Sequence, residues 1–423
     1  MKKQKQVVRF DMKRLPFRQN AVLTVLAWIL SFPEVWMRGL RIRKVNMKGL
    51  KPPYIMLNTH MAFLDFKVAT AAIFPRRANN IVAIDGFIGR EWLLRLVGCI
   101  CKRKFTNDFV LVRQIDHVLK KNKDILIIYP EARYSLAGTT AVLPESLGKL
   151  VKLMNVPVVV LNMHGHYLNS PCWNLKKRGV PVRADMTQII RADEIGALDY
   201  KQINDRIGAA FYYDEYRWQK DNHIRIKHKD NAKGLHKVLY KCPNCMTENK
   251  MNSEGVKLWC GHCGKEWVMS ELGELSAVSG RTEFTHVPDW YEFERAEVRR
   301  EIELGTYGFS DEAVIVDSLP NAKGYIRLGE ARLSHGMDGF RLEGEFGGMP
   351  FMLRKTPESM YSCHIEYDYF GKGDCIDLST IEDTYYIYPQ IGNVAVTKIA
   401  LATEELYKYD ALAQSAVIKE SAV

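Results

Sequence analysis

The sequence predicts an α/β protein that continues into a small cysteine-bearing unit and a β-rich C-terminal part. Three observations predict this class. Apolar strand-like runs alternate with stretches of helical periodicity up to about residue 225, two Cys-x-x-Cys pairs follow, and β-rich runs separated by Gly-containing turns come last. At 423 residues the chain is long enough for two or three domains with cores of their own.

The first 50 residues are strongly basic and hold one short apolar segment. They contain 12 Lys or Arg and two acidic residues. The apolar segment 21–32 is shorter than the roughly 20 residues that a helix needs to span a bilayer, and its aromatic side chains lie near basic flanks. This pattern predicts a helix lying in the surface of one membrane leaflet. A helix buried against the domain core is the alternative.

The next feature is a histidine and an aspartate, His60 and Asp65, that follow the apolar strand expected at 54–57. A neutral imidazole can take a proton from an attacking hydroxyl when a carboxylate bonded to its other nitrogen fixes the tautomer. Turns after buried strands commonly carry such chemistry. Taken alone, a hydrogen-bonded structural histidine is the commoner interpretation.

Four blocks in the order of the chain resemble the glycerolipid acyltransferases, the family typified by bacterial 1-acyl-glycerol-3-phosphate acyltransferase. The blocks are 60–65, 84–103, 129–135 and 156–160, and together they cover about residues 50 to 170. Two positions depart from the family pattern. Ala62 stands where the family usually has Ser, and Ala132 replaces a Gly, with the following Arg one position early.

The resemblance implies a mixed sheet with flanking helices and an O-acyltransferase. The expected reaction moves a fatty acyl group from acyl-CoA or acyl-carrier protein to the free hydroxyl of 1-acyl-glycerol 3-phosphate, a lysophospholipid, and forms phosphatidic acid. His60 is then the general base and Asp65 its orienting partner, with no catalytic cofactor and no covalent nucleophile. Another lysophospholipid or glycerol 3-phosphate remains open as the acceptor.

The same resemblance suggests ligands for the acceptor. Arg103 and Arg133 are the candidate phosphate ligands, because guanidinium binds phosphate bidentately and stays charged. Glu131 is expected beside the phosphate, where a carboxylate can orient an arginine or a glycerol hydroxyl. Lys102 and Lys104 are expected to be solvated.

After the four blocks we expect a strand at 180–190 and a helix at 199–219, with the domain ending near residue 225. The Lys-rich stretch 222–241 has no regular ligand spacing and is interpreted as a solvated linker.

Two Cys-x-x-Cys pairs, Cys242 with Cys245 and Cys260 with Cys263, stand 14 residues apart. This spacing is typical of a zinc ribbon, in which four thiolates hold a tetrahedral Zn²⁺. Since all four ligands are cysteine, the site is closed and structural. The spacing of the other cysteines does not suggest disulfide pairs, which indicates a reducing compartment.

A zinc ribbon also allows a protein of another class, a nucleic-acid or protein-binding module. Nucleic acid is disfavoured because the ribbon has few basic residues, and residues 271–423 hold 14 basic against 27 acidic residues. A protein partner of the ribbon or of the C-terminal domain fits better.

The C-terminal part has β-rich runs at 313–317, 325–328, 340–345, 361–369 and 384–388, followed by a helix at 395–409. We expect a packing or docking domain without chemistry of its own. The sequence thus divides into a membrane-associating segment (1–45), an acyltransferase domain (46–225), a linker and zinc ribbon (226–280) and an acidic β-rich domain (281–423). The basic front places the protein, by expectation, on the cytoplasmic face of a membrane.

Overall fold

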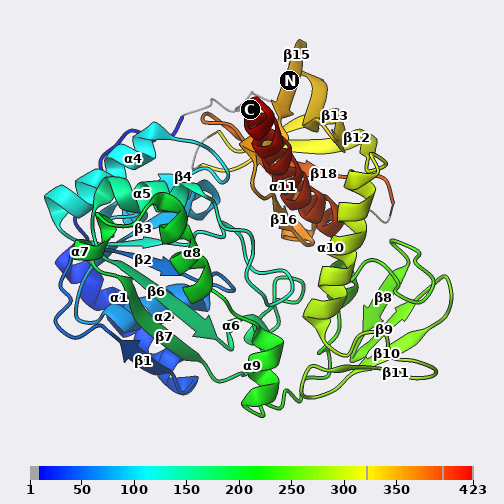
Figure 1. The fold of residues 1–423 in the computed structure, drawn as a ribbon, viewed down its shortest axis with the longest axis horizontal. Coiled ribbons are helices and arrows are strands. Elements are labelled where there is room, and N and C mark those ends of the chain that lie inside the picture. The colour runs from blue at the N-terminus through cyan, green and yellow to red at the C-terminus, as the bar shows by residue number, and fades with distance from the viewer. Residues whose placement is uncertain (1–8, 321–322, 393–394, 422–423) are drawn as a thin grey trace.

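The computed structural model describes residues 9–320, 323–392 and 395–421 (Figure 1). Its N-terminal half is a seven-stranded sheet in the order β1-β7-β6-β2-β5-β3-β4. Neighbouring strands run parallel except β6 and β7, which are antiparallel, so the mixed sheet is confirmed. The strands are β1 (Arg41–Val45), β2 (Tyr54–Asn58), β3 (Ala78–Ala83), β4 (Ile100–Lys102), β5 (Ile125–Ile128), β6 (Val158–His164) and β7 (Arg183–Ile190).

Helices cover both faces of this sheet because successive side chains of each buried strand point to opposite sides. Met56 and Ile127 pack with α1 and α2, whereas Leu57 and Ile128 pack with α4, α5 and α8. The expected helix at 199–219 is two helices, α8 and α9. The helices of this half are α1 (Ala21–Met37), α2 (Leu64–Ile73), α3 (Glu91–Leu96), α4 (Phe109–Asp116), α5 (Ser146–Met154), α6 (His166–Asn169), α7 (Ala192–Ile195), α8 (Tyr200–Ala210) and α9 (Glu215–Asp221).

Helix α1 is packed on one side and exposed on the other. Asn20 caps it through bonds to the backbone N–H groups of Val22 and Leu23. Its buried side rests on α2, and its other side exposes apolar residues. These are Val22, Val25, Leu26, Ile29, Leu30, Trp36 and Met37. Within the part of the chain that the structure describes, no helix has both the length and the apolar character to cross a membrane.

The segment predicted to be a solvated linker is instead packed. Leu235, Val238 and Leu239 are fully buried and Tyr240 is nearly so. They join the main core to a four-stranded antiparallel sheet in the order β11-β10-β9-β8, where the ring of Trp267 meets that of Trp290 on α10. The elements are β8 (Met251–Glu254), β9 (Lys257–Cys260), β10 (Glu266–Met269), β11 (Leu275–Ala277) and α10 (Val287–Glu303).

The C-terminal part is a second seven-stranded sheet, antiparallel, in the order β15-β14-β13-β12-β18-β17-β16. The run expected as a strand at 361–369 gives only the short β16, and the final helix α11 continues past residue 409. The elements are β12 (Phe309–Ser318), β13 (Ile326–Gly336), β14 (Gly339–Phe346), β15 (Met349–Lys355), β16 (His364–Glu366), β17 (Cys375–Ser379), β18 (Thr384–Tyr388) and α11 (Val396–Ser421).

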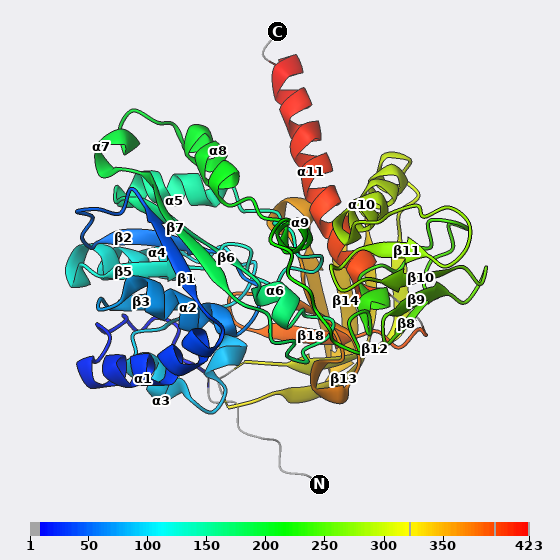
Figure 2. The same cartoon turned by 90° about the horizontal axis from the view of Figure 1, so that it is seen from below.

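The two large sheets form one body, with the ribbon beside the second (Figure 2). Phe87 and Cys101 of the first half share a hydrophobic core with Leu319, Tyr386 and Tyr388 of the second. The β-rich part therefore packs directly on the edge of the first sheet where β3 and β4 end. Of the two roles expected for it, packing and docking, these contacts support packing.

Candidate active site

His60 and Asp65 meet at the end of β2. Nδ1 of His60 lies 3.1 Å from Oδ2 of Asp65, which lies in the first turn of α2. The same carboxylate oxygen accepts the backbone N–H groups of Met61 (2.6 Å) and Ala62 (3.1 Å). The tight strand-to-helix turn therefore fixes the carboxylate, and the carboxylate fixes the imidazole.

A second histidine, His166 at the start of α6, binds the other oxygen of Asp65. Its Nδ1 lies 2.6 Å from Oδ1, and the side chain is fully buried. Burial raises the pKa of Asp65, but the hydrogen bonds from His166 and His60 outweigh burial and lower it to about 2. Asp65 is therefore a carboxylate at neutral pH. No spacing in the sequence links His166 to Asp65.

The loop after β5 surrounds the His60 ring. Tyr129 and Tyr134 lie on it, each with a ring centroid 4.5 Å from that of His60, and the backbone N–H of Ser135 donates to the carbonyl of His60 at 3.0 Å. The segments 60–65 and 129–135, the first and third sequence blocks, thus pack against each other.

Glu131 connects this loop to His60 through hydrogen bonds. It accepts hydrogen bonds from the backbone N–H of His60 (3.1 Å), that of Ala141 (2.7 Å) and the hydroxyl of Tyr213 (2.8 Å). It is fully buried, and burial outweighs these bonds and raises its pKa to about 7. Glu131 is not on the cavity wall, so the structure assigns it to positioning His60 rather than to contact with an acceptor.

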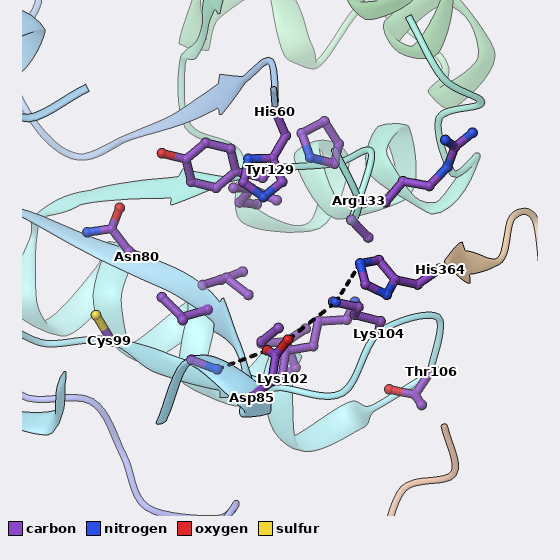
Figure 3. Close-up of a pocket in the computed structure, with 18 of the residues that line it drawn as sticks. His60, Asn80, Asp85, Cys99, Lys102, Lys104, Thr106, Tyr129, Arg133 and His364 are labelled. Carbon is purple, nitrogen blue, oxygen red and sulfur yellow. Dashed lines mark hydrogen bonds and ion pairs between the residues drawn. The ribbon is translucent and has the colours of Figure 1, made fainter. Parts of the chain in front are cut away.

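His60 opens onto a large cavity of about 1210 Å³ (Figure 3). A single small-molecule site usually occupies about 300–1,000 Å³, so this space is larger than a typical site of that kind. One part of its wall is apolar, formed by Leu93, Leu94, Val97, Leu111, Val112, Ile115, Leu147 and Leu150. The described residues leave His60 Nε2 without a hydrogen-bond partner.

Arg103 does not line this cavity. Its two terminal nitrogens donate to four acceptors of the C-terminal domain, at 2.8 to 3.2 Å. These are the carbonyls of Leu319, Pro320 and Glu382 and the hydroxyl of Thr384. The structure therefore corrects the expectation of a phosphate ligand at Arg103, which instead anchors one domain to the other.

Arg133 lines the cavity, but its guanidinium points away from His60 (Figure 3). Nη2 pairs with Glu404 of α11 at 2.5 Å, and Nε donates to Ser362 at 3.3 Å. The turn before it places Ala132 at a φ of +54°, the left-handed region that favours glycine. The charge of Arg133 is thus paired with Glu404, while its buried Nη1 has no hydrogen-bond partner among the described residues, and its role as a phosphate ligand stays a prediction.

The two lysines differ from expectation as well. Lys104 is mostly buried and lies 3.6 Å from both Asp85 and Asp377. Burial opposes its charge, but these carboxylates outweigh burial and raise the pKa of Lys104. Lys102 lines the cavity, where burial lowers its pKa, and the described residues offer it no carboxylate within ion-pair distance.

The four predicted cysteine ligands come together in the ribbon. The Sγ atoms of Cys242, Cys245, Cys260 and Cys263 all lie within 4.8 Å of one another, with pairs at 3.7 and 3.8 Å. A tetrahedron with Zn–S bonds of about 2.3 Å has edges of about 3.8 Å, so this donor set fits zinc.

The fold and the site define an α/β domain with a His–Asp pair on the wall of a mostly apolar cavity. No protein-family model matches this chain, and neither does any curated protein. Among solved structures, the chain is similar to the 1-acyl-sn-glycerophosphate (LPA) acyltransferase PlsC from Thermotoga maritima. The TM-score is 0.37 at 12% identity, covering 44% of this chain and 76% of that one. A TM-score of this size does not establish a shared fold, and the functional assignment depends on the site itself.

Proposed function

We propose that this protein is an O-acyltransferase that moves a fatty acyl group from a thioester to a hydroxyl of a lipid acceptor. The observation that carries the proposal is the His60–Asp65 pair at 3.1 Å on the wall of a large, mostly apolar cavity. Apolar side chains suit an acyl chain, and transfer of its acyl group to a hydroxyl needs a base such as His60.

In the proposed step, His60 Nε2 accepts the hydroxyl proton while the acceptor oxygen forms a bond to the thioester carbonyl carbon. The C–S bond then breaks, and the imidazolium returns its proton to the leaving thiolate. Asp65 stabilises the imidazolium and stays ionised because its pKa is about 2. The step uses neither a covalent intermediate nor a metal at the dyad.

The acceptor that we test first is 1-acyl-glycerol 3-phosphate, with acyl-CoA or acyl-carrier protein as donor and phosphatidic acid as product. The position of Lys102 favours an acceptor that carries an anionic group. This lysine lines the cavity and has no carboxylate partner among the described residues. Other lysophospholipids and glycerol 3-phosphate are the alternative acceptors.

We also propose that the protein works on a membrane surface, at its cytoplasmic face. Phe63, Phe109 and Leu153 line the cavity and are 70%, 91% and 60% exposed. Together with the exposed apolar side of α1, they suit the acyl region of a leaflet. The zinc ribbon is proposed as a structural unit, with a protein partner as its only further role.

The test is an acyl-transfer assay with labelled lysolipids and each donor, run on the wild type and on His60→Ala. Labelled diacyl product from the wild type, at least about a hundredfold above the variant, supports the proposal. Transfer that is equal in both proteins, or absent with every donor and acceptor, refutes it.

A further inference from the structure

The C-terminal domain forms one wall of the cavity that His60 faces. Its contribution comes from β16, from the segments on either side of β16 and from a residue before β13: Tyr325, Tyr361, His364, Glu366, Tyr369 and Phe370. Figure 3 shows His364 entering from β16 beside Lys104 of the first domain. The cavity is therefore complete only when both domains are present.

A chain of paired polar and charged side chains fixes this wall in place. His364 lies 2.7 Å from Asp377 through Nδ1 and 2.8 Å from Lys104 through Nε2, and Lys104 also faces Asp85 at 3.6 Å. The charge of Lys104 is thus balanced inside the protein and is not available to a ligand anion. A second carboxylate, Glu366, lies 3.4 Å from the same imidazole Nε2 and lines the cavity.

The loop after β16 is held in an unfavourable backbone conformation. Asp368 and Phe370 have φ values of +48° and +52°, in the left-handed region that non-glycine residues seldom adopt. Between them, Tyr369 turns toward Tyr325, and their hydroxyls lie 2.7 Å apart. Such strain tends to persist where a site needs a side chain in a set position.

The chemistry of this wall suits hydroxyl groups rather than a bare phosphate. Glu366 can accept from a hydroxyl, the tyrosine hydroxyls can donate and accept, and their rings can pack on the C–H face of a polyol. A phosphate site would instead need free guanidinium or ammonium groups, and Lys104, Arg103 and Arg133 are all engaged internally.

We propose that the C-terminal domain selects the acceptor of the reaction, and that Glu366 and Tyr369 bind the hydroxyls of a polyol head group on that lipid. This inference rests on the proposed function, because it takes the cavity beside His60 to be the site of acyl transfer. The anion of such a lipid, its phosphodiester, would then lie toward Lys102, and the polyol toward β16.

The experiment measures lipid binding without turnover, in protein that carries His60→Ala. Lysophosphatidylinositol and lysophosphatidic acid with the same acyl chain are titrated, and each dissociation constant is determined. We compare this background with added Glu366→Ala, which removes the acceptor oxygens, and with added Tyr369→Phe. The matched control is Tyr385→Phe. Tyr385 belongs to β18 of the C-terminal sheet and does not line the cavity.

We expect the background protein to bind the inositol lipid more tightly. Each cavity variant should weaken this binding about five- to tenfold, the loss of one hydrogen bond, and change lysophosphatidic acid binding by less than about twofold. Tyr385→Phe should change neither. Equal weakening for both lipids, or no weakening for either, overturns the inference. Because binding is read without transfer, failure of the acyltransferase reaction is detected separately, in the activity assay.

Discussion

Asp65 connects two histidines, and this arrangement sets how well His60 can act as a base. One carboxylate oxygen faces His60 and two backbone N–H groups, and the other faces His166. Removal of His166 would leave a buried carboxylate oxygen without its partner and raise the pKa of Asp65. His166 is thus a positioning residue that acts through Asp65.

We therefore expect His166→Ala to lower kcat about tenfold or more with little change in KM, and to move the acid limb of the kcat–pH profile to higher pH. His166→Asn, which keeps an N–H near the same position, should retain most of the activity. A pH profile of both variants checks this. Unchanged profiles in both would show that His166 only fills space.

The raised pKa of Glu131 predicts that the free energy of unfolding depends on pH. Its pKa is raised from 4.5 to about 7 in the folded protein, so the unfolded chain releases this proton first. The free energy of unfolding must then fall as the pH rises from about 4.5 to about 7, at a slope of at most about 1.4 kcal/mol per pH unit. Denaturant unfolding across this range should show a smaller fall for Glu131→Gln than for the wild type. Parallel curves would contradict the assignment.

Sites formed by residues close together in the sequence could be predicted. Contacts between elements far apart in the sequence could not. The four cysteines lie in one ribbon, so their spacing alone predicts the site. His60 and Asp65 lie on a single strand-to-helix turn, where their spacing together with the order of the neighbouring blocks singles them out. Arg103 and Arg133 find their partners more than 200 residues away. Their pairing depends on how two domains pack, and a single sequence carries no signal for that.

The ribbon should depend on its metal. With four thiolates in a closed site, we expect one zinc per chain, and chelation should unfold the ribbon because metal binding supplies its folding free energy. The Trp267–Trp290 contact reports this, since their ring centroids are 4.9 Å apart. Metal analysis and tryptophan fluorescence before and after chelation check it. A native spectrum in metal-free protein would show that the ribbon folds without zinc.

In the molecule as a whole, the exposed apolar surface and the distribution of charge are the two features behind the proposed membrane contact. The exposed side of α1 and the cavity-lining Phe63 and Phe109 belong to the first domain, which also carries the basic N-terminal segment. The acidic charge lies in the C-terminal part, which would repel an anionic leaflet.

We expect Val22→Asp with Ile29→Asp to weaken binding to vesicles that contain anionic lipid by at least about tenfold, because both side chains are exposed on α1. Leu175→Asp is the matched control, an exposed leucine on a loop after α6. Vesicle co-sedimentation at two salt concentrations checks both. Equal loss in the control would place the membrane contact elsewhere.

The packing of the two domains explains why the function is only partly visible in the sequence. The acyltransferase resemblance ends near residue 170, yet Tyr325 and His364 line the same cavity as His60. The His60–Asp65 pair and the sheet that carries it could be predicted, whereas the second wall could not, because it comes from a part of the chain with no motif.

In the proposed reaction His60, oriented by Asp65, removes the acceptor proton on this cavity wall. The most direct measurement is the single-turnover rate of acyl transfer for wild type, His60→Ala and Asp65→Asn at saturating lysolipid. We predict that the first variant loses about a hundredfold or more and the second a substantial part of that, with acceptor binding retained. A His60→Ala rate equal to the wild-type rate would contradict the account.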